Sequence, residues 1–157
     1  MRRTIDTPEQ MEELGARIAR QLTAGDVVAL TGELGAGKTT LTRGLGHALG
    51  VRGAVASPTF VLARTHPRSG GAPLVHVDAY RLSDASELED LDIDFAGSIV
   101  VVEWAEGMLD GVAESWLAVQ IDRPKGASGA PVVFDDLAEP REVTITGHGR
   151  RWAGFTL

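Results

Sequence analysis

The sequence contains no cysteine, which excludes disulfides and thiolate-bound metal sites and is compatible with a reducing compartment. It contains no asparagine either, so the N-K-x-D motif with which GTPases read guanine cannot be present. No apolar stretch is long enough for a signal peptide or a membrane span. We therefore expect a soluble, cytoplasmic protein that does not bind membranes.

Positive charge is scarce. The chain has 15 basic and 22 acidic residues, a formal net charge of −7. A surface of this sign repels a nucleic acid backbone, so we expect another subunit to hold any RNA connected with this protein. The length suits one domain with its own core, and no linker or repeat divides it, so we expect a single domain over residues 1–157.

The most informative segment is a phosphate-binding motif. Residues 32–39 match the pattern G-x-x-x-x-G-K-[ST] as Gly32, Glu33, Leu34, Gly35, Ala36, Gly37, Lys38 and Thr39. Glycines let backbone N–H groups surround phosphate oxygens, lysine supplies a compact charge, and the threonine hydroxyl can bind Mg²⁺. Only two basic residues of the chain are lysines, and one stands here. The motif predicts a nucleoside triphosphate site, and the missing guanine motif favours ATP.

The flanking residues give this motif the setting it requires. The apolar run at 26–31 predicts a buried strand, and residues 39–49 predict a helix with leucines on one face and Gly50 at its end. The positive end of that helix would then face the phosphates. Upstream, Thr7 is expected to cap another helix that starts at Pro8, with Gln10 in the capping-box position, and continues to Ala24-Gly25.

The rest of the pattern is rich in strands. We expect strands near 60–65, 74–78, 99–103, 116–121 and 143–146, and a short helix from Asp84 to Leu91. The unbroken β-branched run at 99–102 is typical of a strand buried on both faces of a sheet. The predicted fold class is α/β, a three-layer P-loop NTPase sandwich with a central, largely parallel sheet that antiparallel strands extend.

Two of the predicted strands end in an acid, Asp78 and Glu103. Ligands in open α/β sheets bind beyond the carboxyl ends of strands, so both acids are expected to face the phosphates, although either alone would also fit a solvated surface charge. Trp104 can stack on a base or simply pack at the strand exit. Thr59 fits a mobile threonine that senses the γ-phosphate, or a strand start. His76 is interpreted as structural.

Four segments in this order and spacing resemble the TsaE family of bacterial P-loop ATPases: residues 32–40, Ser57-Pro58-Thr59-Phe60, residues 76–82 and Val102-Glu103-Trp104. The resemblance extends from about Thr7 to about Ile121. It implies a role in placing threonylcarbamoyladenosine in tRNA, with TsaB and TsaD as partner proteins and with tRNA reached only through their complex.

The resemblance also implies roles for individual residues. Lys38, Asp78 and Glu103 would be catalytic, and Thr39 and Glu103 would hold Mg²⁺. Asp78 would support hydrolysis, and Thr59 would be the switch threonine. Nucleotide contacts are expected from Thr7, Glu33, Leu34, Gly35, Ala36, Gly37, Lys38, Thr39, Thr40, Thr59, Trp104 and Glu106, with Trp104 beside the adenine. The segment from Asp122 to Pro140 departs from the family pattern, so the sequence does not assign Arg141 to an arginine contact.

Three functions remain in competition at this point. The first is an ATPase that is slow alone, because no arginine finger is evident, and that partner proteins stimulate. The second is a small-molecule kinase, for which the loop from Arg64 to Arg68 is the candidate lid. The third is a docking module that binds ATP without hydrolysing it.

Overall fold

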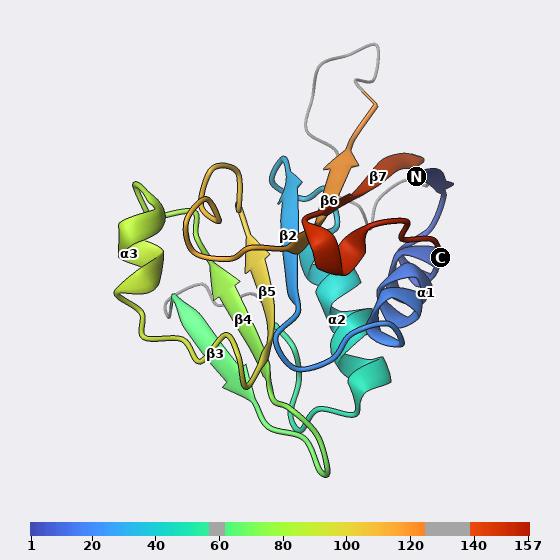
Figure 1. The fold of residues 1–157 in the computed structure, drawn as a ribbon. Coiled ribbons are helices and arrows are strands. Elements are labelled where there is room, and N and C mark those ends of the chain that lie inside the picture. The colour runs from blue at the N-terminus through green and yellow to red at the C-terminus, as the bar shows by residue number, and fades with distance from the viewer. Residues whose placement is uncertain (57–61, 125–138) are drawn as a thin grey trace.

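The computed structural model describes residues 1–56, 62–124 and 139–157, which form one seven-stranded sheet in the order β1-β7-β6-β2-β5-β4-β3 (Figure 1). The strands are β1 (Arg2–Ile5), β2 (Val27–Gly32), β3 (Ala63–His66), β4 (Leu74–Asp78), β5 (Ile99–Glu103), β6 (Trp116–Asp122) and β7 (Arg141–His148). The helices are α1 (Pro8–Ala19), α2 (Lys38–Leu49) and α3 (Ala85–Glu89), with a 3₁₀ turn η1 (Arg150–Trp152) near the end.

The centre of the sheet is parallel and its edges are antiparallel. Strands β6, β2, β5 and β4 run in one direction, while β7 and β1 on one side and β3 on the other oppose their neighbours. In Figure 1 the arrowheads of the four parallel strands point to the same edge, at the top of the view. The predicted fold class is confirmed, and this edge is where a ligand of an open α/β sheet binds.

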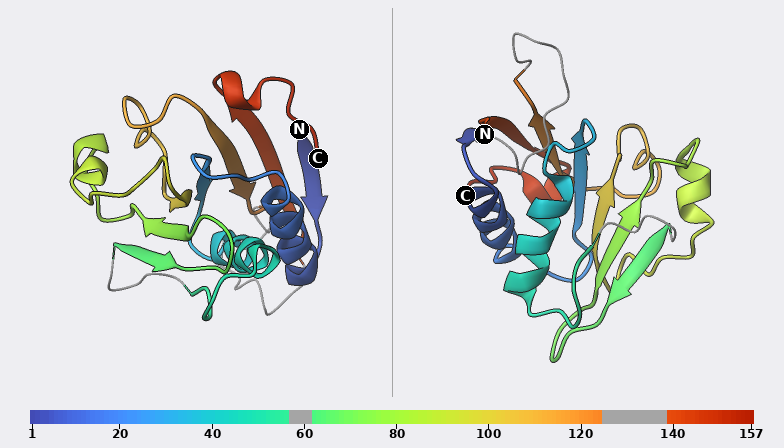
Figure 2. Two further views of the ribbon diagram at one scale, coloured as in Figure 1. Left: turned by 60° about the horizontal axis from the view of Figure 1, so that its bottom comes forward. Right: turned by 180° about the vertical axis from the view of Figure 1, so that it is seen from behind.

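Each face of the sheet has its own apolar layer. Helices α1 and α2 cover one face, as the right view of Figure 2 shows, and α3 lies on the other side. Along β5 the side chain of Val101 packs in the cluster under α1 and α2, whereas Val100 and Val102 pack with Leu88 of α3 and with Met108. The prediction that this strand is buried on both faces is therefore confirmed.

Two glycines let α1 and α2 approach each other closely. A Cβ atom at Gly15 would collide with the carbonyl oxygen of Leu41, and one at Gly44 would collide with the backbone of Glu12. This contact holds α2 against the rest of the helical layer and so fixes the position of its first residue, Lys38.

Several predicted boundaries agree with the structure. Thr7 caps α1, its Oγ1 accepting a hydrogen bond from the Gln10 backbone N–H at 3.2 Å, and Asp84 caps α3. Gly50 ends α2 in the left-handed conformation, with φ of 71°. Strands β4 and β5 have the predicted bounds, and α3 ends slightly early, at Glu89 rather than Leu91.

One expectation about the N-terminal part was wrong. Helix α1 ends at Ala19, well before Ala24, because Gln21 and Leu22 already bond to carbonyls three residues back. Leu22 is nevertheless buried, which explains why it continued the apolar pattern of the helix. The residues of β1 were not expected to form a strand. Of the predicted strand at 60–65, only the last part can be compared, as β3, because residues 57–61 lie outside the described ranges.

Candidate nucleotide-binding site

The glycine-rich loop, residues 32–37, joins the end of β2 to the start of α2. Gly35 and Gly37 have φ values of 75° and 116°, a region that side chains other than glycine rarely adopt. Gly37 is also the N-cap residue of α2, and no side chain caps that end of the helix. The backbone N–H groups of the first turn are thus left without a side-chain acceptor, as an oxyanion site requires.

Lys38 is the buried cation of this site, with 5% of its surface exposed. Its Nζ donates hydrogen bonds to the carbonyl oxygens of Gly32 at 2.8 Å and Glu33 at 2.9 Å. Burial lowers the pKa of the ammonium group, and the charges of Glu103 and Asp78 oppose that shift. In the described structure its hydrogen bonds go to neutral carbonyls, so a phosphate would give the ammonium a stronger, charged partner.

Asp78 and Glu103 lie side by side at the ends of β4 and β5, where they are register partners. Glu103 is 3% exposed, and its Oε1 accepts a hydrogen bond from Thr39 Oγ1 at 3.2 Å and lies 3.0 Å from His76 Nε2. Asp78 is half-buried, and its Oδ1 accepts from the Tyr80 backbone N–H at 3.0 Å. The structure thus brings Lys38, Thr39, Asp78 and Glu103 together.

This set of groups suits a magnesium ion. Hydroxyl and carboxylate oxygens are the ligands that Mg²⁺ prefers, and Thr39 and Glu103 present one of each within hydrogen-bond distance. Within the described ranges no group of three or more His, Cys, Asp and Glu side chains could hold a metal by itself. A metal with few protein ligands, which also binds phosphate oxygens and water, fits that donor set.

Trp104 covers the loop from the side of β5. Its ring centroid is 4.1 Å from Lys38 Nζ and 5.0 Å from the ring of Tyr80, and its φ of 59° is unusual for a bulky residue. A cleft of about 620 Å³ opens beside it, lined by Thr31, Gly32, Glu33, Trp104, Glu106, Gln120 and Asp122. Three expected nucleotide contacts, Glu33, Trp104 and Glu106, therefore share one cleft.

The remaining expected contacts lie in different surroundings. Leu34 is 84% exposed at the tip of the glycine-rich loop, while Ala36 is buried and Thr40 is half-buried in the first turn of α2. Thr7 has a role of its own as the cap of α1. Thr59 falls outside the described residues.

Two side chains join the site that the sequence did not point to. His76 reaches Glu103 from within β4, although it was interpreted as structural. Arg123 follows β6 directly, and its Nη1 donates to the Leu34 carbonyl at 3.5 Å, beside Gly35. Its position beyond the carboxyl end of a strand next to β2 was a usable signal, but the arginine contact in this part of the chain was weighed only for Arg141. Arg141 instead lies buried in β7, where burial lowers its pKa and the nearby charge of Arg123 lowers it further.

Within the described residues, the loop proposed as a kinase lid makes contacts that stabilise the fold. Arg64 belongs to β3, and Arg68 donates to the carbonyls of Ala72 at 2.7 Å and Leu49 at 3.4 Å. The guanidinium of Arg68 thereby ties the turn after β3 to the end of α2. The bonds of Arg68 give it a structural role, while Arg64 stays exposed on β3, so the kinase interpretation stays untested.

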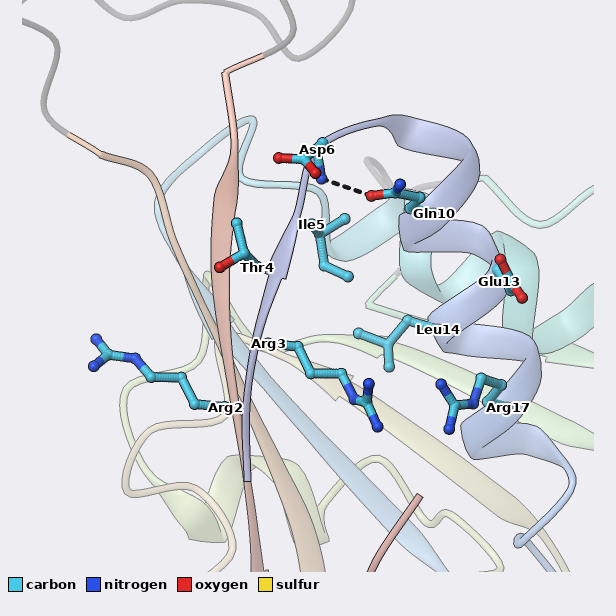
Figure 3. Close-up of a pocket in the computed structure, with 9 residues that line it drawn as sticks. All are labelled: Arg2, Arg3, Thr4, Ile5, Asp6, Gln10, Glu13, Leu14 and Arg17. Carbon is cyan, nitrogen blue, oxygen red and sulfur yellow. Dashed lines mark hydrogen bonds between the residues drawn. The ribbon is translucent and has the colours of Figure 1, made fainter.

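A second hollow, of about 460 Å³, lies between β1 and α1 (Figure 3). It shares no lining residue with the cleft beside Trp104, and both signs of charge line it: Arg2, Arg3 and Arg17 together with Asp6 and Glu13. Arg2 pairs with Glu142, and Arg3 donates to the backbone oxygen of Leu157. Figure 3 shows the guanidinium groups of Arg3 and Arg17 turned toward each other, with Asp6 at the other end of the hollow. This hollow has no glycine-rich loop at the start of a helix, so the loop at residues 32–37 remains the candidate site.

Comparison with known proteins shows which family the chain is similar to. Residues 5–129 match the model of the family described as "Threonylcarbamoyl adenosine biosynthesis protein TsaE". A protein of Streptomyces coelicolor named tRNA threonylcarbamoyladenosine biosynthesis protein TsaE is 58% identical, over 91% of this chain and 94% of its own. The protein of that name from Bacillus subtilis is 36% identical, over 96% of this chain and 87% of its own.

A solved structure is similar as well. The crystal structure of Bacillus subtilis YdiB matches 98% of this chain and 88% of its own, with a TM-score of 0.73 and 29% sequence identity. The overall fold described above is thus shared with a solved protein. From the family match and these relatives, the chain belongs to the TsaE family of threonylcarbamoyladenosine biosynthesis proteins.

Proposed function

We propose that this protein is a cytoplasmic, Mg²⁺-dependent ATPase that serves the threonylcarbamoyladenosine modification of tRNA by cycling a complex of TsaB and TsaD. The observation that carries the proposal is the group formed by Lys38, Thr39 and Glu103 at the uncapped start of α2. It unites a buried cation, an oxygen pair suited to Mg²⁺ and free backbone donors at one point.

The triphosphate would lie along the glycine-rich loop. The N–H groups of the loop and of the first turn of α2 would donate to phosphate oxygens, and the Lys38 ammonium would exchange two backbone carbonyls for an oxyanion. Thr39 and Glu103 would hold Mg²⁺, which when bound neutralises charge on the phosphates. The Trp104 ring and the cleft beside it offer a flat surface for the base.

Hydrolysis requires a water molecule in line with the bond that breaks. Asp78 stands beside Glu103 at the strand ends and is half-buried, so its carboxylate can orient that water by accepting a hydrogen bond. The water oxygen bonds to the γ-phosphorus as the bond to the bridging oxygen breaks. ADP and phosphate leave, and the proton of the water ends on phosphate. Lys38 and the loop N–H groups stabilise the charge that develops.

Support for the tRNA pathway comes from the family and from charge. The relatives carry the pathway in their names, and a chain of net charge −7 is poorly suited to hold RNA itself. We therefore assign contact with tRNA to the partner complex. We expect the isolated protein to turn over slowly, and partner binding to accelerate it.

The test is ATP hydrolysis by the purified protein alone and with TsaB and TsaD, in parallel with formation of the modified nucleoside. The wild-type protein should hydrolyse ATP slowly alone and faster in the complex, and Asp78→Asn should bind ATP but lose both activities. Fast hydrolysis that the partners do not change would contradict the proposal. Modification that survives in Asp78→Asn would instead support a docking module in which ATP only stabilises a surface.

A further inference from the structure

His76 makes a buried contact with Glu103, a residue of the proposed metal site. It lies in the middle of β4, fully buried, and its Nε2 is 3.0 Å from Oε1 of Glu103 on β5. Glu103 itself is 3% exposed. A buried carboxylate needs donors to hold it, because it can only accept hydrogen bonds when it is ionised.

Within the described part of the chain, two side chains donate to the Glu103 carboxylate, and both reach the same oxygen. One is the Thr39 hydroxyl at 3.2 Å, and the other is His76. Thr39 is itself a proposed metal ligand, so His76 is the donor that stays outside the proposed metal site. The second carboxylate oxygen, Oε2, receives no hydrogen bond from a described side chain.

The other ring nitrogen of His76 indicates where the proton lies. Nδ1 is buried and has no hydrogen-bond partner among the described residues. A proton on Nδ1 would be a buried donor without an acceptor, whereas a proton on Nε2 points at Glu103. The arrangement is therefore that of an Nε2–H tautomer that donates to the carboxylate.

From these contacts we propose that His76 is a positioning residue for Glu103. Its imidazole, anchored on a central strand, holds Oε1 and so fixes the orientation of the carboxylate that would bind Mg²⁺. This inference rests on the proposed function, since it takes Glu103 as a metal ligand. Groups of this kind, which touch a ligand and not the metal, change metal affinity by about 10–100-fold when they are removed.

The opposing interpretation is that His76 only fills space in the core. The two are separable because glutamine can place an amide N–H where Nε2 stands, whereas leucine fills a similar volume without a donor. We would compare His76→Gln with His76→Leu, and use His76→Met as a second variant without a donor in case the branched side chain prevents folding. His66→Leu is the matched control, because it removes another buried histidine, from the neighbouring strand β3.

The measurement is the binding of a fluorescent ADP analogue at increasing Mg²⁺, with its binding in EDTA as the reference. Donor-free variants that remain folded should need about tenfold more Mg²⁺ for half of the metal-dependent gain, with affinity in EDTA unchanged. His76→Gln and His66→Leu should resemble the wild-type protein. Equal Mg²⁺ requirement in wild-type and donor-free proteins would overturn the inference, and so would equal weakening in the Gln and Leu variants.

A second measurement does not depend on nucleotide or metal. A long-range ¹H–¹⁵N spectrum of the wild-type protein should show His76 with its proton on Nε2, and a bare Nε2 facing Glu103 would overturn the inference.

The Mg²⁺ titration separates this inference from the proposed function. If Mg²⁺ has no effect on nucleotide binding by the wild-type protein, the proposed function itself fails. If the wild-type protein responds to Mg²⁺ and His76→Leu responds identically, only the positioning role fails.

Discussion

The ammonium nitrogen of Lys38 lies 4.1 Å from the ring centroid of Trp104, so the cation of the glycine-rich loop rests against an aromatic face. Trp104 holds this position with a φ of 59°, which is costly for a bulky residue. The same lysine bonds to the carbonyls of Gly32 and Glu33. A phosphate that draws Lys38 toward itself must therefore change the surroundings of the Trp104 ring.

This relationship predicts an optical signal for nucleotide binding. Addition of ATP and Mg²⁺ should change the tryptophan fluorescence of the wild-type protein, because the ring loses or alters its contact with the cation. Trp104→Phe should lose the change, whereas Trp116→Phe, at the start of β6, should keep it. A full signal in Trp104→Phe would show that the nucleotide does not disturb this contact.

Stability should depend on pH through His66. Burial lowers the pKa of its imidazole, while a hydrogen bond to the Arg52 backbone opposes the shift. As pH falls below the ordinary value of about 6.5, the unfolded chain takes up a proton that the folded chain refuses. The free energy of unfolding should thus be fully present above that value and decline as pH falls toward the folded pKa.

Urea unfolding at a series of pH values tests this expectation. His66→Gln cannot be protonated, so its free energy of unfolding should fall less over the same range than that of the wild-type protein. Identical pH dependence in the two proteins would remove His66 as the cause.

The helix crossing predicts a stability effect of one added methyl group. Gly44→Ala would place a Cβ against the backbone of Glu12 and force α1 away from α2, which we expect to cost about 1–3 kcal/mol of unfolding free energy. Urea unfolding measures it. His47→Ala, at an exposed position of the same helix, is the control and should change stability by less than about 0.5 kcal/mol. Equal stability of Gly44→Ala and wild type would contradict the close approach.

The parts that sequence reasoning predicted well are those with a strong local signal. The motif at 32–39 and the apolar runs of β4 and β5 have a periodicity or composition that one segment carries by itself. Strand β1 lacks such a signal, because it is an edge strand paired only with β7 and only one of its four side chains, Ile5, is buried. Its existence depends on a partner nearly the whole chain length away.

Sequence reasoning missed His76 and Arg123 for the same reason, because both reach the site through contacts between segments that are distant in the chain. The register of β4 against β5 brings His76 and Glu103 into contact, and no pattern within either segment reveals that pairing. Arg123 reaches the glycine-rich loop only because β6 lies next to β2 in the sheet. Contacts between segments distant in the chain depend on strand order, which the sequence pattern left open.

Arg123 should contribute to nucleotide affinity. Its guanidinium lies beside Gly35, and a positive group at that position attracts phosphate oxygens. Arg123→Ala should raise the dissociation constant of ATP about tenfold, in the range expected for loss of one charge-assisted hydrogen bond. The matched control is Arg20→Ala, an exposed arginine at the end of α1, which should leave the constant unchanged. Equal constants for Arg123→Ala and wild type would place Arg123 outside the site.

The central claim is that the glycine-rich loop binds a triphosphate with Lys38 and a magnesium ion held by Thr39 and Glu103. Calorimetric titration of a non-hydrolysable ATP analogue, with and without Mg²⁺, tests it most directly on the wild-type protein and on Lys38→Met and Glu103→Gln. The account predicts one site that Mg²⁺ strengthens, no measurable binding to Lys38→Met, and binding to Glu103→Gln that Mg²⁺ no longer strengthens. Undiminished affinity in Lys38→Met, or an affinity that Mg²⁺ leaves unchanged in the wild-type protein, would contradict it.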